Sequence, residues 1–103
     1  MDTNIIKYNF LLFTLLLCIK VNTYANTIYV GKGKAFTQIK QAVNASKNGD
    51  TIIVEGGIYK EGNIIISKSI VLSGKDYPIL DGELKYEIIS IKSDSVNVNG
   101  FRI

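Results

Sequence analysis

A repeat of about 25 residues constrains the fold of this chain more than any other feature. The segment 64–74 reads IIISKSIVLSG and recurs as ISIKSDSVNVNG at 89–100. The offset between the two copies is longer by one residue at the end than at the start, because one residue is inserted near Asp94. Short apolar runs separated by Gly, Asn, Asp and Ser follow one another in this half of the chain. A repeat of this length made of short strands is the signature of a β-solenoid.

The second copy also indicates which side chains face the interior. Apolar and polar residues alternate along its three short runs, and alternate residues of a strand point to opposite faces. Ser90, Asn97 and Arg102 are therefore expected to face outward. The same register places Ile65 and Val71 outward in the first copy. The residues expected to face inward are Ile64, Ile66, Ile70, Leu72, Ile89, Ile91, Val96, Val98, Phe101 and Ile103.

Ahead of the repeat, four apolar residues within 36–45 recur at spacings of three, three and one, which places them on one stripe of a helix. These are Phe36, Ile39, Ala42 and Val43. Asn48-Gly49 is expected to end the helix, since Gly tolerates a positive φ. A solenoid leaves an unpaired strand edge at its first coil, so we expect the helix to cap that end. The predicted fold is an all-β solenoid, a right-handed parallel β-helix with an N-terminal capping α-helix.

The segment 1–25 has the pattern of a secretory signal peptide. A nearly uniform apolar run from Phe10 to Ile19 follows a short polar segment, and the small residues Thr23 and Ala25 predict cleavage after Ala25. A transmembrane anchor is the alternative, but this run is too short to cross a bilayer core, which needs about 20 residues. We therefore expect a signal peptide, 1–25, and an exported mature part, 26–103. Contact with a membrane is expected only through the signal peptide.

The mature part lacks several residue types on which chemistry often depends. It contains no His, Cys or Met, since Cys18 precedes the expected cleavage site. Catalysis of the Ser–His or Cys–His kind is therefore excluded within it, and it offers no soft ligand for copper. Its lysines are scattered singly, without the clustered basic face of a nucleic-acid site. Arg102, the sole Arg, is a type of residue that a lyase can use as a base, but here it is one outward residue on a strand.

Two glycine patterns share spacing with nucleotide-binding motifs but lack their essential residues. The segment 31–33 lies between a strand and a helix, as in a dinucleotide fingerprint, but Phe36 stands where the third Gly is required. The segment 57–62 has the glycine spacing of a P-loop, but Asn63 follows it in place of Lys. We therefore predict no nucleotide site.

Four carboxylates form a loose acidic group between residues 76 and 87, namely Asp76, Asp81, Glu83 and Glu87. Carboxylates on neighbouring β-helix loops can hold Ca²⁺ through oxygen ligands. No compact ligand loop is visible, however, and Asp81-Gly82 is a typical turn pair. Solvated surface charges are the favoured interpretation. We thus predict no catalytic, cofactor-binding or metal-ligating residue in this chain.

Two stretches resemble known families. The first, FTQIKQAVNASKNGDTIIVEGGIY (36–59), is similar to the front end of right-handed β-helix proteins of the pectin-lyase-like class. That class includes lyases, epimerases, esterases and non-enzymes, so the resemblance implies a fold and export but no activity. The second (61–103) resembles the start of the NosD family of nitrous oxide reductase maturation proteins. It matches I-x-K-S-I-x-L-x-G-K-D-Y-P-x-L-D-G, then K-Y-E-I-I-x-I-K, then G-F.

The second resemblance implies a non-enzymatic, periplasmic accessory protein for the copper centre of nitrous oxide reductase. Its implied partners are that reductase and an ABC-type transporter. No copper ligand is implied in this segment, and copper is expected only elsewhere in a full-length protein. A carbohydrate-binding or polysaccharide-cleaving β-helix protein is the alternative. Counting two coils, fewer than the roughly three that stabilise a solenoid, we expect 26–103 to be the cap and first coils of a longer protein.

Overall fold

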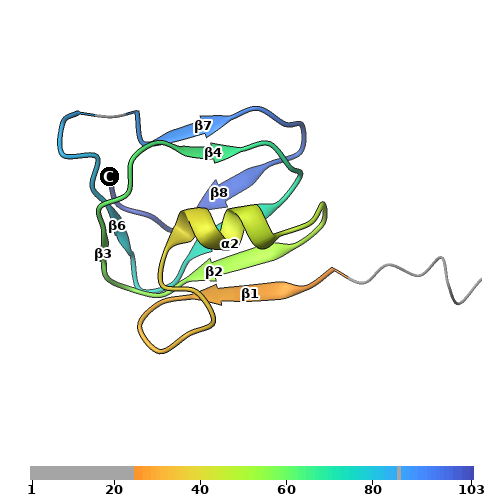
Figure 1. Cartoon of the computed structure of the whole chain (residues 1–103), viewed down its shortest axis with the longest axis horizontal. Coiled ribbons are helices and arrows are strands. Elements are labelled where there is room, and N and C mark those ends of the chain that lie inside the picture. Colours follow the sequence, from red (N-terminus) through yellow and green to blue (C-terminus); the bar gives the residue numbers. More distant parts are fainter. Residues whose placement is uncertain (1–24, 86) are drawn as a thin grey trace, which may run out of the picture.

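The computed structural model describes residues 25–85 and 87–103. Their chain winds into a β-solenoid of about 3 turns, a parallel β-helix, with one short helix beside its first coils (Figure 1). The elements in chain order are β1 (Thr27–Val30), α2 (Ile39–Ala45), β2 (Thr51–Val54), β3 (Ile58–Tyr59), β4 (Ile64–Ile66), β5 (Val71–Gly74), β6 (Ile79–Leu80), β7 (Ile89–Ile91) and β8 (Asn97–Asn99). The predicted signal peptide, 1–25, lies outside the described residues except for Ala25. Within that described part, no helix is both long and apolar enough to span a bilayer.

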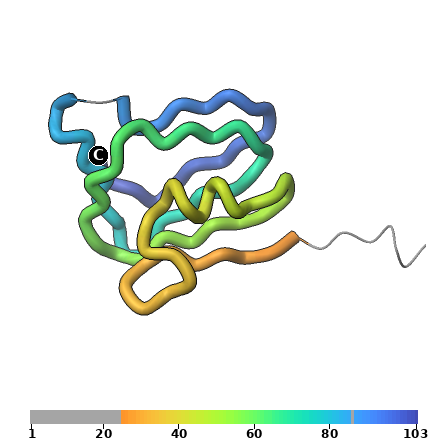
Figure 2. Tube along the Cα trace, viewed as in Figure 1, coloured from red at the N-terminus to blue at the C-terminus, as the bar shows by residue number. Residues whose placement is uncertain are grey.

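Three parallel sheets form the three sides of the solenoid. Sheet A has the strand order β1-β2-β5-β8, sheet B consists of β3 and β6, and sheet C consists of β4 and β7. Each full coil contributes one strand to each sheet, and the tube in Figure 2 shows the successive coils lying side by side. The predicted parallel β-helix is thereby confirmed.

The pairing of the strands follows the sequence repeat. Ile64 pairs with Ile89, as the start of the repeat predicts, and Leu72 pairs with Val98 at the offset that is longer by one residue. The inserted residue lies in the turn between β7 and β8, where Ser95 adopts a φ of 57°. A turn can absorb an extra residue without shifting the register of the strands that it joins. Both offsets inferred from the sequence are confirmed.

Most of the predicted interior is also confirmed. The side chains of Ile64, Ile66, Ile70 and Leu72 are buried, and Ile65 is 48% exposed, as expected for an outward residue. In the later copy Ile89, Val96, Val98 and Phe101 are half-buried against the same core. Ile91 and Ile103, which the alternation also places inward, are not buried, since they are 52% and 82% exposed. Ile91 pairs with buried Ile66, but no described strand covers its other side.

The helix is shorter than the sequence pattern predicts. It begins at Ile39, so Phe36 is not a helical residue. Phe36 instead forms a parallel bridge with Val30 and packs half-buried against the core. The expected C-terminal stop is also displaced: the helix ends at Ala45, and Gly49, with a φ of 91°, forms the turn into β2. The buried stripe of Ile39, Ala42 and Val43 lies against β1, β2 and β4.

The count of two coils is wrong, because the solenoid begins before the sequence repeat. β1 pairs in register with β2, Ile28 opposite Ile52, and β2 pairs with β5, Ile52 opposite Leu72. The sequence separation of the paired residues differs between these two strand pairs, so no constant period marks the first coil. The connection from β1 to β2 contains α2 and no strand of sheets B or C, so the early coil does not repeat the pattern of the later ones.

Candidate functional site

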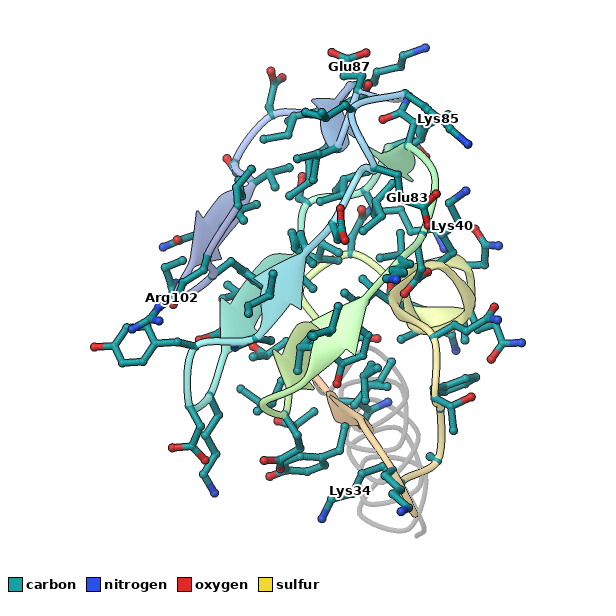
Figure 3. All side chains as sticks on the ribbon, turned by 90° about the vertical axis from the view of Figure 1, so that its left-hand side faces the viewer. Lys34, Lys40, Glu83, Lys85, Glu87 and Arg102 are labelled. Carbon is teal, nitrogen blue, oxygen red and sulfur yellow. The ribbon has the colours of Figure 1, made fainter. Side chains whose placement is uncertain are left out.

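The acidic group considered for Ca²⁺ is not assembled by the fold. Among residues 25–85 and 87–103, no three His, Cys, Asp or Glu side chains gather in a way that could hold a metal ion. The Asp81 carboxylate accepts the backbone N–H of Glu83 at 2.8 Å, which is a local turn contact. The carboxylate of Glu83 lies 4.0 Å from Lys85 Nζ. Figure 3 shows Glu87 at the top of the view and Glu83 lower, at about the height of Lys40, and both residues are exposed.

The two glycine patterns meet in space but not as a phosphate site. Gly31 and Gly57 line one hollow of about 440 Å³ beside β3, together with Lys32 and Tyr59. The Tyr59 hydroxyl donates to the carbonyl of Glu55 at 2.8 Å, and burial raises the pKa of Tyr59 with smaller help from nearby carboxylates. Neither pattern opens directly into a helix, which a phosphate cradle of this kind requires.

Both ends of α2 are held by charged side chains from the coil that follows. The Glu61 carboxylate accepts the backbone N–H groups of Ile39 at 2.6 Å and Lys40 at 2.9 Å. The helix has no capping side chain of its own at that end. A carboxylate at a helix N-terminus satisfies unpaired donors and complements the macrodipole. The sequence analysis missed this role, because the cap comes from the next coil rather than from the helix itself.

The opposite end of the helix receives a positive charge. Lys68 Nζ donates to the carbonyl oxygens of Ser46 at 2.6 Å, Asn44 at 3.0 Å and Val43 at 3.3 Å. Carbonyls at a helix C-terminus lack intrahelical partners and favour a cation. Glu61 and Lys68 lie on either side of β4, so one strand with its two flanks clamps the whole helix. We call this pair the helix clamp.

Asp50 fastens the chain at the entry to the first coil. Its carboxylate accepts the backbone N–H of Asn26 at 3.0 Å and that of Lys47 at 2.8 Å, and the residue is 3% exposed. These two hydrogen bonds, the one from Asn26 first, hold the pKa of the Asp50 carboxyl below its ordinary value of 3.8, although burial opposes them. Asp50 is therefore a structural carboxylate that joins the start of β1 to the turn after α2.

The outer face of sheet A is uncharged along its four described strands. One outward row runs Tyr29, Ile53, Ser73 and Asn99 across these strands, in register. The Ser73 hydroxyl donates to Asn99 Oδ1 at 2.8 Å, and Asn99 Nδ2 donates to Asn97 Oδ1 at 3.1 Å. Tyr29 is 48% exposed at the other end of the row. The row on this face thus carries hydroxyl and amide groups at one end and an aromatic ring at the other.

The outer face of sheet B is different in character. Ile58 pairs with Ile79, and Ile79 forms a bridge with Arg102, so these three residues follow one another along the solenoid. Arg102 is exposed, which confirms its predicted outward position. Figure 3 looks onto this side of the solenoid and shows Arg102 at its rim. The Arg102 guanidinium lies 5.2 Å from the ring centre of Tyr77. We call Ile58, Ile79, Tyr77 and Arg102 the sheet B face.

Comparisons with known proteins do not assign either face. No protein-family model, no curated protein and no solved structure matches this chain.

Proposed function

We propose that this protein is an exported, non-enzymatic scaffold that assists in building the copper centre of nitrous oxide reductase in the periplasm. The observation that carries the proposal is the resemblance of residues 61–103 to the start of the NosD family. The signal-peptide pattern supports it, because export would bring the protein to the compartment where that family works.

The motif positions have structural roles that fit a scaffold. Lys68, the Lys of I-x-K-S-I, closes the C-terminal end of α2. Gly74, the Gly of G-K-D-Y-P, lies where a Cβ atom would be 2.5 Å from the carbonyl oxygen of Gly100 in the next coil. Pro78 of the same motif is fully buried. Lys68 thus joins the cap to the coils, and Gly74 lets two coils pack closely, as a rigid binding platform needs.

Copper would be cargo in this role, and residues 26–103 would not supply its soft ligands. The segment has no His, Cys or Met, the side chains that bind copper best. Its expected contribution is to hold the cap and coils in place and to present a surface to other proteins. The reductase and an ABC-type transporter are the partners that the resemblance suggests.

Deletion of the gene tests the proposal. The reductase polypeptide should accumulate to its usual amount but contain little copper and show little activity. A plasmid copy of the gene should restore both, and a copy without the signal-peptide segment 1–25 should not. Normal copper content and activity of the reductase in the deletion strain would contradict the proposal.

Carbohydrate binding is the second candidate, and the outer face of sheet A favours it. Sugars are bound by hydroxyl and amide groups together with aromatic rings. Ser73 and Asn99 provide the polar groups at one end of the row across this sheet, and Tyr29 provides the ring at the other end. Titration of the purified protein with neutral oligosaccharides tests this candidate, with Tyr29→Ala as the matched variant. Cleavage of a polyuronate by the purified protein would favour the enzymatic form of this alternative.

A further inference from the structure

The sheet B face exposes three large apolar side chains close together. Ile58 is 64% exposed, Ile79 is 38% exposed and Tyr77 is 64% exposed. They lie together because Ile58 and Ile79 are paired on adjacent strands and Tyr77 closely precedes Ile79 in the chain. Single exposed apolar residues are ordinary, but a cluster on one face marks an interaction site.

The polar part of this face is held rigidly. The backbone N–H of Arg102 donates to the Pro78 carbonyl at 3.0 Å, and the Arg102 carbonyl accepts the N–H of Leu80 at 2.8 Å. Pro78 itself is fully buried. Tyr77 has a φ of 50°, a left-handed conformation that is uncommon for an aromatic residue and that here accompanies a ring beside the guanidinium. The Arg–Tyr pair is thus presented by fixed backbone on both sides.

Arg102 carries a charge that no described carboxylate neutralises. The one ion pair among the described residues joins Lys85 to Glu83, and the Arg102 side chain donates no hydrogen bond within that part of the chain. Its contact with Tyr77 uses the face of the ring and leaves the N–H groups of the guanidinium open. A planar guanidinium with free donors binds a carboxylate through two parallel hydrogen bonds.

We propose that the sheet B face docks an acidic segment of a partner protein. A Glu or Asp carboxylate of that segment binds Arg102, and a neighbouring apolar side chain packs on Ile58 and Ile79. A protein segment fits better than a sugar, because the isoleucines offer no hydrogen bonds to hydroxyl groups, whereas the outer face of sheet A does. Tyr and Arg are also the residue types enriched at the energetic centres of protein interfaces. This inference does not depend on the role in copper maturation.

Arg102 provides a direct probe, because it is the sole Arg within residues 1–103 and its side-chain Nε–H signal is assigned by its loss in Arg102→Gln. The ¹⁵N-labelled full-length protein is titrated with acetyl-Leu-Glu-Leu-Glu-Leu-amide and, separately, with the same peptide carrying Gln for Glu. The glutamate peptide should move the Arg102 signal in a saturable way. The glutamine peptide should bind at least about tenfold more weakly, because it loses the charge-assisted hydrogen bonds.

Variants then assign the binding to this face, with the backbone amide signals of Ile58 and Ile79 as the readout. Arg102→Gln should lower the affinity for the glutamate peptide about tenfold. Arg102→Lys should retain part of that affinity, because lysine keeps the charge but lacks the bidentate fork. The control is Lys92→Gln, which removes an exposed charge just after β7 and should change nothing. Circular dichroism checks that each variant is folded.

Three results would overturn the inference. The first is equal affinity for the two peptides, and the second is full binding by the folded Arg102→Gln protein. The third is a tighter response of the Arg102 signal to trigalacturonate than to the glutamate peptide, since that would assign the face to an acidic sugar.

Discussion

The first and last coils of this solenoid follow the same alternation of inward and outward residues but are buried to different degrees. At the first coils the interior is closed by α2, and Ile39, Ile52 and Ile64 are at most 1% exposed. At the last described coil, Val98 is half-buried although it continues the row of Ile52. Ile91 is 52% exposed although it continues the row of buried Ile66. Inward direction is a property of the strand, whereas burial depends on the layers on both sides.

The helix clamp explains why the first end can be closed by such a short helix. Helices of 7 residues are not stable alone, and α2 has no side-chain cap of its own at its N-terminal end. Glu61 and Lys68 satisfy its free N–H and C=O groups from the next coil. The cap is therefore as stable as its attachment to β4, and the two ends of the solenoid should respond differently to substitution.

The largest difference is expected from placing a carboxylate at an inward position of an inner coil and at one of the last described coil. Ile66→Asp should lower the free energy of unfolding by at least about 3 kcal/mol, since it removes core packing and buries a charge. Val98→Asp in the last coil should cost less, because its site is half-buried. Ile65→Asp and Asn97→Asp are the outward controls and should stay within about 0.5 kcal/mol of the wild type. Thermal melts measure all four, and equal losses would show that the inward register is wrong.

A smaller loss should follow from Gly74→Ala, which tests the contact between the last two coils. The new Cβ atom would lie 2.5 Å from the Gly100 carbonyl oxygen and 2.8 Å from the Pro78 ring, so backbone must move. We expect a cost of about 1–3 kcal/mol in urea unfolding. Gly62→Ala is the control, because its Cβ would meet only the end of the Lys40 side chain at 3.4 Å. If both substitutions cost the same, close packing of the coils at Gly74 is not the cause.

The helix clamp should contribute about 1–2 kcal/mol at each end. Lys68→Met keeps the aliphatic stem but leaves three carbonyl groups at the end of α2 without this donor. Glu61→Gln weakens the cap at the other end. Lys92→Met, at an exposed lysine near the last coil, is the control. Hydrogen exchange of the α2 amides should rise in the clamp variants alone, and unchanged exchange would argue against the clamp.

The smallest effect concerns the pH dependence contributed by Asp50. Because its pKa is lowered in the folded state, Asp50 stabilises the fold above pH 3.8, and this contribution is lost as the pH falls through the lower folded-state value. The wild type should therefore lose more stability than Asp50→Asn when the pH is lowered from neutral into the acid range. Urea unfolding at both pH values measures the difference. A parallel loss in the two proteins would assign the acid sensitivity to other carboxylates.

More of the second half of the fold than of the first was predictable from the sequence. The rows of Ile64 with Ile89 and Leu72 with Val98 were predictable because a repeated pattern of apolar residues reports its own register. The pairing of β1 with β2 left no such trace, because the chain between these strands forms α2 in place of strands of sheets B and C. Phe36 fits a helical stripe by spacing, yet it pairs with Val30.

By itself, the sequence determined the period, the inward rows and the types of chemistry that the mature part lacks. These properties are local: they depend on alternation along a strand and on which residue types are present. Only the tertiary structure decided that Glu61 and Lys68 hold the two ends of one helix, and that Tyr77 and Arg102 meet beside two exposed isoleucines. Each of these contacts joins residues of different coils that are far apart in the sequence. Winding into coils brings such residues together without leaving a mark on the local pattern.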